Sequence, residues 1–213
     1  MKGLPRLYLI ADVDTARRDE IDLVEVVSRF VSAGGRMVSL RPGGADDKSV
    51  MELGRELSAL LFSVRGVFLM HRRPDLALLL GADGVHLPSR GLSPREVKRL
   101  LGPSAVMGRS CHDGDEVGRA ISRGETFVTL GPLFESLSKK GYGPSLGVDE
   151  FRAIADEAVD GDLPVYALGG VLPENGGQCL EAGAYGLAVV GGILGADDVE
   201  AATREYLAVL EEC

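Results

Sequence analysis

Short apolar runs alternate with longer amphipathic segments along the whole chain. The apolar runs are four to six residues long and nearly uninterrupted, which is typical of parallel strands buried on both faces. The amphipathic segments place apolar residues at helical spacing, as at Ile21, Val24 and Val27. The predicted strands span Arg6–Ala11, Arg36–Leu40, Val67–Met70, Gly84–Leu87, Ala105–Gly108, Thr126–Leu130, Pro164–Leu168 and Gly186–Val190. The predicted helices span Ile21–Ala33, Ser49–Phe62, Asp75–Leu80, a segment opening at Ser93-Pro94, Asp115–Ser122, Val148 to about Ala158, Pro173–Ala182 and Asp198–Leu210.

Eight strands alternating with eight helices indicate the fold class α/β, as a closed parallel (β/α)₈ TIM barrel. The length of 213 residues fits one domain, so we expect a single barrel domain over residues 1–213. The alternative is a doubly wound open sheet. We favour the barrel because open sheets usually carry fewer strands, and because no GxGxxG motif follows the first predicted strand.

Composition and charge narrow the range of partners. The formal net charge is −9, so we expect neither nucleic acid nor a membrane surface as a partner. The three cysteines are widely spaced and form no CxxC motif, which predicts reduced thiols, no zinc site and a cytoplasmic protein. No apolar run is long enough for a membrane helix, and the first apolar run is too short for a signal peptide.

Two glycine pairs are the strongest local signal for a ligand. Gly169-Gly170 follows the seventh predicted strand, and Gly191-Gly192 follows the eighth. In such barrels the loops after these strands, with a short helix behind them, commonly bind phosphate through backbone N–H groups. Ile193-Leu194-Gly195 is a candidate for that short helix. The alternative is that the glycines only make tight turns between strand and helix.

A long polar loop follows the sixth predicted strand. It runs from Gly131 to Gly147 and carries Ser136 and Ser138 beside Lys139 and Lys140. In an acidic chain, adjacent lysines at the catalytic end of a barrel suit an anionic ligand. The alternative is a solvated charged loop without a ligand.

These segments resemble the thiamine phosphate synthase and thiazole tautomerase superfamily along nearly the whole chain. The resembling segments are Tyr8–Asp12, Asp75–Ala77 followed by Gly81–Leu87, Gly131–Lys139, Ala167–Val171 and Ala182–Val190. The last two patterns are common to many phosphate-binding barrels, whereas their combination with Gly81–Leu87 is specific. For a synthase, the resemblance implies that a thiazole phosphate attacks the methylene group of a pyrimidine diphosphate and that diphosphate leaves.

The resemblance also implies roles for individual residues. It implies that Ser136, Ser138 and the two glycine pairs hold a thiazole phosphate, the expected small-molecule partner. For a synthase it further implies that Ser110 and Lys139 face the diphosphate, and that the protein is a homodimer. The implied magnesium ligands do not match, because Arg72 and Gly91 stand where a synthase has aspartates. We therefore predict no metal ligands and no cofactor, with Mg²⁺ involved only if the synthase alternative holds.

Other segments resemble the thiazole tautomerase branch, which moves a proton and needs no metal. They are Leu87–Ser89, Ser93-Pro94, Gly108–Ser110 with His112, and Lys139–Gly141. That branch carries a catalytic histidine where this chain has Pro132, which has no titratable group. We rank first a metal-independent, tautomerase-like isomerase of thiamine biosynthesis. The alternatives are a diverged synthase, a transferase in which arginines replace magnesium, and a non-catalytic binder of thiazole or thiamine phosphate.

Three residues are the candidates for catalysis. His71 follows the third predicted strand and is the natural proton carrier, since an imidazole titrates near neutral pH. Arg41 and Arg72 follow the second and third strands and could clamp a phosphate or a carboxylate. We expect His86 to be structural, His112 to be a cap or a surface residue, and Cys111 not to be a nucleophile.

Overall fold

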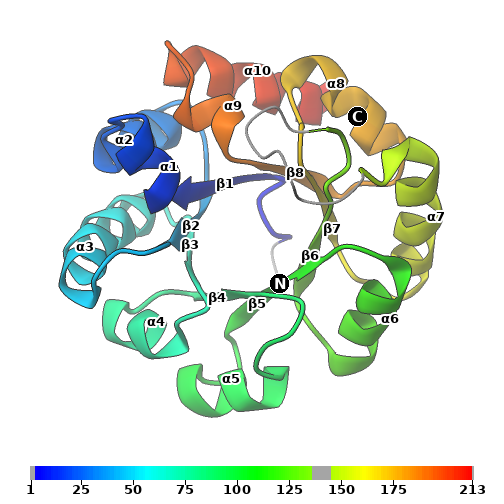
Figure 1. Cartoon of the computed structure of the whole chain (residues 1–213), viewed down its shortest axis with the longest axis horizontal. Coiled ribbons are helices and arrows are strands. Elements are labelled where there is room, and N and C mark those ends of the chain that lie inside the picture. The colour runs from blue at the N-terminus through cyan, green and yellow to red at the C-terminus, as the bar shows by residue number, and fades with distance from the viewer. Residues whose placement is uncertain (1–2, 136–144, 213) are drawn as a thin grey trace.

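The eight strands pair in chain order, and the last strand pairs with the first, so the sheet is closed. The computed structural model describes residues 3–135 and 145–212. All strand pairs are parallel, and the helices form a ring outside them (Figure 1). The pairing of β8 with β1 confirms the (β/α)₈ barrel and excludes the open sheet. The strands are β1 Leu7–Asp12, β2 Met37–Arg41, β3 Val67–His71, β4 Gly84–Leu87, β5 Val106–Cys111, β6 Phe127–Leu130, β7 Val165–Leu168 and β8 Gly186–Val189.

The helices follow the amphipathic segments closely. They are α1 Val13–Arg18, α2 Leu23–Ser32, α3 Asp47–Ser63, α4 Pro74–Leu80, α5 Pro94–Leu101, α6 Gly114–Arg123, α7 Gly147–Asp160, α8 Pro173–Glu181, α9 Gly191–Leu194 and α10 Val199–Glu212. The start of α5 is as predicted: Ser93 caps it and Glu96 completes a capping box.

Two elements differ from the prediction. The short helix α1 was not predicted, because a single turn with two buried residues, Val13 and Ala16, has too little apolar periodicity to detect. The strand β5 runs to Cys111, three residues beyond its predicted end. Its polar residue Arg109 interrupts the apolar run, yet that side chain is buried through an ion pair described below.

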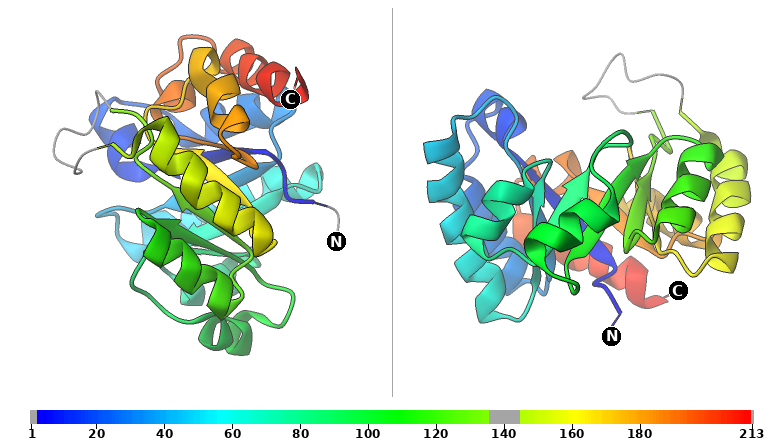
Figure 2. Two further views of the ribbon diagram at one scale, coloured as in Figure 1. Left: turned by 90° about the vertical axis from the view of Figure 1, so that its right-hand side faces the viewer. Right: turned by 90° about the horizontal axis from the view of Figure 1, so that it is seen from below.

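Side chains fill the barrel in a packed interior. Tyr8, Phe127 and Tyr166 contact each other edge to face, with ring centroids 5.3–5.9 Å apart. A larger apolar cluster lies between the strands and the surrounding helices. The N-terminal segment lies at the end of the barrel where the strands begin (Figure 2), and Tyr166 Oη donates a hydrogen bond to the Pro5 carbonyl (2.7 Å). The N-terminal segment therefore packs against this end of the barrel.

None of the helices among the described residues is both long enough and apolar enough to span a lipid bilayer.

Candidate active site

The C-terminal ends of β1 and β2 carry an ion pair at the mouth of the barrel. The Arg41 guanidinium Nε lies 2.6 Å from Asp12 Oδ1, and the Arg41 side chain is 28% exposed. Asp12 also accepts hydrogen bonds from the Thr15 amide and hydroxyl, so it caps α1 while it orients Arg41. Burial by itself would raise the pKa of Asp12, but the hydrogen bonds from Arg41 and Thr15 and the charge of Arg41 lower it overall. Asp12 is therefore ionised at neutral pH and holds Arg41 at the mouth.

The predicted proton carrier, His71, ends β3 at the same face. Only 7% of the residue is exposed, and its ring Nε2 lies 2.9 Å from Ser39 Oγ. The ring stacks on His86 of β4, with centroids 4.5 Å apart and planes 10° apart. His71 is thus positioned by its neighbours at the rim of the barrel, as the sequence predicted.

His86 is paired with His71 on the neighbouring strand, inside the barrel. Burial, together with the positive charges of Arg109 and Arg41, lowers its pKa to about 3. Its ring Nε2 lies 3.0 Å from Ser110 Oγ and its Nδ1 lies 3.1 Å from Tyr8 Oη. His86 is therefore neutral, and both of its ring nitrogens have hydrogen-bond partners inside the barrel.

Arg72 also follows β3, but it is placed differently from His71. Its side chain is exposed, and its backbone has φ +62°, in the left-handed region that non-glycine residues rarely adopt. The Arg72 amide donates to the His86 carbonyl (3.0 Å), which continues the pairing of β3 with β4 past the end of the strand. Arg72 lies at the rim of the mouth, as expected from the sequence.

The first glycine pair makes the turn after β7. Gly169 and Gly170 have φ +97° and +64°, and a Cβ on either would lie 2.7 Å from Pro132 or Phe134 of the loop after β6. Asn175 of α8 fastens this turn, because its Nδ2 donates to the Gly170 carbonyl (2.9 Å) and its Oδ1 accepts from the Leu172 amide (2.8 Å). Backbone conformation and close packing therefore explain these glycines without a ligand, and the turn they form still lies at the mouth.

The second glycine pair begins the short helix α9, which confirms the helix predicted behind β8 with a start two residues earlier. A Cβ on Gly192 would collide with the Tyr206 hydroxyl, whereas a Cβ on Gly191 would have nothing within 4 Å. The first N–H groups of a helix have no partner within it, so they are available to an anion. Packing therefore explains why position 192 is a glycine, but it does not explain the glycine at position 191.

Other predicted ligand contacts fall in two classes. Ser110 faces the barrel interior near the end of β5 and is partly exposed, bonded to His86 as above. Ser136, Ser138 and Lys139 lie outside the described residues, so their predicted contacts with phosphate stay predictions.

His112 is exposed and its Nδ1 lies 2.9 Å from Glu116 Oε2, which confirms a surface position. Burial raises the pKa of the Cys111 thiol to about 12, so the thiol is protonated at neutral pH and a poor nucleophile.

A buried ion pair that no sequence pattern predicted holds the loop after β4. Arg109 and Glu125 lie between the strands and the outer helices, with side chains 2% and 0% exposed and Nε 2.5 Å from Oε1. The Arg109 Nη atoms donate to the carbonyls of Pro88 (2.9 Å) and Leu92 (2.6 Å). The alternation of strand residues gave one clue, because Arg109 stands between two inward-facing positions, Gly108 and Ser110.

A protein-held magnesium ion does not fit the described residues. Arg72 and Gly91 occupy the positions where the resemblance places ligands, and neither offers a carboxylate. Across residues 3–135 and 145–212, no group of three or more His, Cys, Asp or Glu side chains is arranged to hold a metal. The Asp12 carboxylate, which lies beside Arg41 at the mouth, is already engaged by that arginine.

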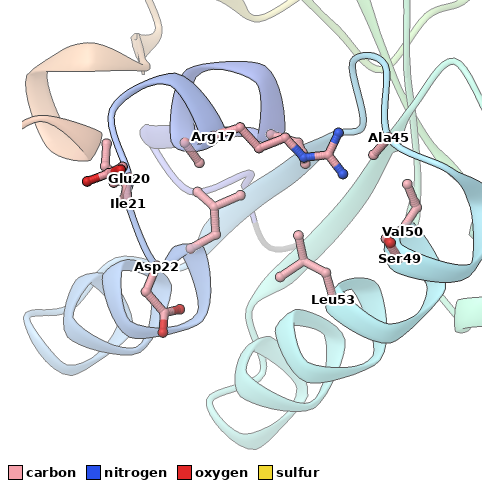
Figure 3. Close-up of a pocket in the computed structure, with 11 residues that line it drawn as sticks. Arg17, Glu20, Ile21, Asp22, Ala45, Ser49, Val50 and Leu53 are labelled. Carbon is pink, nitrogen blue, oxygen red and sulfur yellow. The ribbon is translucent and has the colours of Figure 1, made fainter.

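A pocket of about 380 Å³ lies on the outside of the barrel. It is bordered by α1, the start of α2 and α3, with Arg17, Asp22 and Ser49 among its lining residues (Figure 3). No strand residue lines it, and none of the residues predicted to act at the mouth is among its lining residues.

Comparison with known proteins decides among barrels that share this geometry. A family model described as thiamine monophosphate synthase matches residues 7–193. A putative thiamine-phosphate synthase of Geobacter sulfurreducens is 35% identical over 204 residues, covering 96% of this chain and 93% of that protein. A thiamine-phosphate synthase of Thermus thermophilus is 36% identical over 201 residues, covering 94% and 95%.

The chain belongs to the thiamine phosphate synthase family. This confirms the family resemblance found in the sequence. A solved structure of a thiamine phosphate pyrophosphorylase from Pyrococcus furiosus superposes on this family member with a TM-score of 0.84 and 28% identity, covering 97% and 96% of the two chains. A 3-hexulose-6-phosphate synthase matches with a TM-score of 0.66 at 16% identity, which shows a shared fold alone. These similarities place the protein in thiamine biosynthesis and favour the synthase alternative over the tautomerase-like function that we ranked first.

Proposed function

We propose that this family member is a diverged thiamine-phosphate synthase that joins a thiazole phosphate to a pyrimidine diphosphate. The nitrogen of the thiazole attacks the methylene carbon of the pyrimidine substrate. The bond from that carbon to the diphosphate oxygen breaks, and diphosphate leaves with the electron pair. The observation that carries the proposal is the similarity to synthases over nearly the whole chain, combined with Arg41 and the glycine turns after β7 and β8 at the same end of the barrel.

In this reaction the glycine turns and the two arginines at the mouth would bind different parts of the substrates. The glycine turns and α9 would bind the phosphate of the thiazole through backbone N–H groups. Arg41, held by Asp12, would bind the diphosphate, since a guanidinium can donate two parallel hydrogen bonds to phosphate oxygens. Arg72 at the rim would add positive charge where other synthases are implied to hold magnesium. The protein thus needs no metal ligands of its own to neutralise the leaving group.

A direct assay tests the proposal. Purified protein is incubated with the thiazole phosphate and the pyrimidine diphosphate, with Mg²⁺ or with EDTA, and thiamine phosphate is measured by chromatography. We expect product under both conditions, with rates that differ by less than about tenfold. A rate about a thousandfold lower in EDTA would contradict metal independence, because metal neutralisation of a leaving group is worth several kcal/mol. No product under any condition would refute the synthase.

A second candidate function rests on one observation. His71 is a titratable side chain at the mouth, and it has a hydrogen-bond partner that could pass protons to it. A tautomerase-like isomerase would use such a group to move a proton on a thiazole carboxylate phosphate. Incubating the protein with that substrate in D₂O distinguishes the two reactions, because the isomerase exchanges a carbon-bound hydrogen without any pyrimidine substrate. Tight binding without turnover in both assays would indicate a binding protein.

Restoring the missing acids is expected to create a response to magnesium. In the double variant Arg72→Asp/Gly91→Asp, two carboxylates stand at the positions of the implied ligands. We expect Mg²⁺ to raise its synthase rate at least about tenfold, since two carboxylates are enough to recruit a substrate-bound magnesium ion. The matched control Arg55→Asp/Gly118→Asp makes the same charge change on α3 and α6 of the outer ring. An equal response in both variants, or in neither, would contradict the assigned positions.

Lys139 is expected to contribute directly to ligand binding. Lys139→Ala should weaken the Kd for the pyrimidine diphosphate about fivefold or more, because a charge-assisted hydrogen bond is worth at least about 1 kcal/mol. Calorimetric titration measures the change. Lys48→Ala, which removes an exposed lysine of α3, serves as the control and should leave the Kd unchanged. An unchanged Kd in Lys139→Ala would remove this residue from the proposed site.

A further inference from the structure

Five polar side chains from five consecutive strands meet beneath the mouth. They are Tyr8 on β1, Ser39 on β2, His71 on β3, His86 on β4 and Ser110 on β5. All are buried except Ser110, which is partly exposed. Burying a polar group destabilises the fold unless the group has a hydrogen-bond partner, so each of these five side chains needs one.

Hydrogen bonds link the five side chains into one continuous path. Ser110 Oγ lies 3.0 Å from His86 Nε2, and His86 Nδ1 lies 3.1 Å from Tyr8 Oη. Tyr8 Oη lies 2.7 Å from Ser39 Oγ, and Ser39 Oγ lies 2.9 Å from His71 Nε2. A longer approach of Tyr8 Oη to His71 Nε2, at 3.5 Å, is at the limit of a hydrogen bond. Tyr8 therefore joins the half of the path at His86 to the half at His71.

Each member of this path can donate one proton and accept another. Each hydroxyl has a single proton, and neutral His86 carries one ring proton, so it donates through one nitrogen and accepts through the other. When Tyr8 donates to Ser39, His86 donates from Nδ1 to Tyr8, and Ser110 donates to His86 Nε2. Ser39 then donates to His71 Nε2. The opposite polarity satisfies the same atoms equally well, with every bond reversed.

We propose that this path is a proton relay, in which protonation of His71 reverses each hydrogen bond as far as Ser110. An imidazolium at position 71 has a proton on Nε2 and must donate it to Ser39. To reach this state, His71 Nε2 takes the Ser39 proton, Ser39 takes the Tyr8 proton, Tyr8 takes the Nδ1 proton of His86, His86 takes the Ser110 proton on Nε2, and Ser110 takes a proton from water at the mouth. Ser39 then donates to Tyr8, Tyr8 to His86 Nδ1, and His86 from Nε2 to Ser110. The Ser110 hydroxyl proton is left pointing into the mouth, where it is available to an anionic ligand.

The use of the relay rests on the proposed function. In a synthase, the departing diphosphate accepts the Ser110 proton on an oxygen, and Ser110 takes the Nε2 proton of His86. His86 receives the Tyr8 proton on Nδ1, Tyr8 receives the Ser39 proton, and Ser39 receives the Nε2 proton of His71. One proton leaves His71 and one reaches the diphosphate, and every other group keeps its net charge.

Several charged and titratable groups surround His71 and bear on when it takes up a proton. Tyr8 and His86 contact its ring region from β1 and β4. The Asp12–Arg41 pair lies at the ends of β1 and β2, and Arg72 follows His71 in the chain. Arg109, on the outward side of β5, lowers the pKa of His86 with Arg41 and with burial. His86 therefore stays neutral at neutral pH, as the relay requires.

Nitrogen NMR of the full-length protein labelled in its histidines tests the relay without any substrate. The chain has three histidines, so the ring signals are few, and exposed His112 serves as a reference. We expect the His86 proton to move from Nδ1 to Nε2 over the same pH range in which His71 becomes charged. A His86 tautomer that stays constant while His71 titrates would overturn the relay. So would a His71 that takes up no proton between about pH 5 and 9.

Tyr8→Phe breaks the path and keeps the aromatic ring that packs against Phe127 and Tyr166. In this variant we expect the His86 tautomer to become independent of His71. The matched control is Tyr166→Phe, which removes a buried hydroxyl bonded to Pro5, away from the mouth, and should leave the coupling intact. Loss of coupling in both variants would indicate a general effect of lost packing and would overturn the role given to Tyr8.

The NMR result and the synthase assay can fail independently. Coupled tautomers in a protein that makes no thiamine phosphate would refute the proposed function and leave the relay standing. In an active synthase, we expect Tyr8→Phe to lower kcat at least about tenfold with KM unchanged, since general acid catalysis typically contributes a hundredfold or more. Unchanged kcat in that variant would show that the relay does not serve the reaction.

Discussion

Replacing Glu125 with alanine is expected to lower the free energy of unfolding by about 3–5 kcal/mol. The variant leaves the Arg109 guanidinium buried, hydrogen-bonded to the carbonyls of Pro88 and Leu92 but without the carboxylate that now neutralises it. A buried charge without a counter-charge is among the most destabilising features that a single substitution can create. Because Arg109 also holds the loop after β4, this loop should become more accessible to hydrogen exchange.

Denaturation with urea measures this loss, and two further variants interpret it. Glu205→Ala removes an exposed carboxylate of α10 and should change stability by less than about 0.5 kcal/mol. The double variant Arg109→Met/Glu125→Leu should recover most of the stability lost in Glu125→Ala, since it leaves no charge in the interior. A double variant no more stable than Glu125→Ala would mean that the ion pair itself is strongly stabilising.

We expect the double variant to recover stability because the Glu125 carboxylate is costly to bury. Burial raises the pKa of Glu125, and the charge and hydrogen bond of Arg109 only partly offset this rise. In addition, Glu125 Oε2 is buried and has no hydrogen-bond partner among the described residues. The pair therefore serves the geometry of the loop after β4 more than the stability of the fold.

Acidification is expected to destabilise the protein through His86. Its pKa falls from the usual 6.5 to about 3 in the folded protein because of burial and the charges of Arg109 and Arg41. The unfolded chain binds a proton at this residue below about pH 6.5, whereas the folded protein does so only near pH 3. Stability from His86 is therefore complete above about pH 6.5 and is lost as the pH falls toward 3. At pH 5.0 the loss is about 2 kcal/mol, at about 1.36 kcal/mol for each pH unit.

Urea denaturation at pH 7.5 and at pH 5.0 measures this dependence. His86→Gln cannot titrate, so its loss of stability between the two pH values should be smaller than that of the unmodified protein by about 2 kcal/mol. The control His112→Gln, at an exposed histidine, should retain the full pH dependence. An equal pH dependence in the unmodified protein and in His86→Gln would contradict a neutral, buried His86.

Much of the fold could be predicted from local patterns, because barrel strands are buried on both faces and read as apolar runs. The limits of β4 were predicted without error, and the other strand ends were within one residue except at β5. The exception has a physical cause. Arg109 is polar in sequence and buried in the structure, because Glu125, fourteen residues beyond the end of β5, neutralises it. A periodicity argument cannot see a partner so far along the chain.

The candidate site divides in a similar way. The rule that ligands bind at the C-terminal ends of barrel strands selected Arg41, His71 and Ser110 from sequence, and all three lie at or just below the mouth. The same rule selected Gly169 and Gly170, but the structure shows that packing against the loop after β6 also requires glycine there. Asn175, which fastens that turn, carried no recognisable motif.

The sequence by itself predicted the barrel, the family and the end of the barrel at which we propose that the chemistry takes place, because these follow from strand periodicity and from contiguous motifs. Only the tertiary structure decided which side chains meet. Tyr8, Ser39, His71, His86 and Ser110 are spread over about half of the chain and form one hydrogen-bonded path only because closure of the sheet turns them inward at neighbouring levels. Burial then lowers the pKa of His86 and leaves it neutral, an effect of the surrounding atoms that no local pattern records.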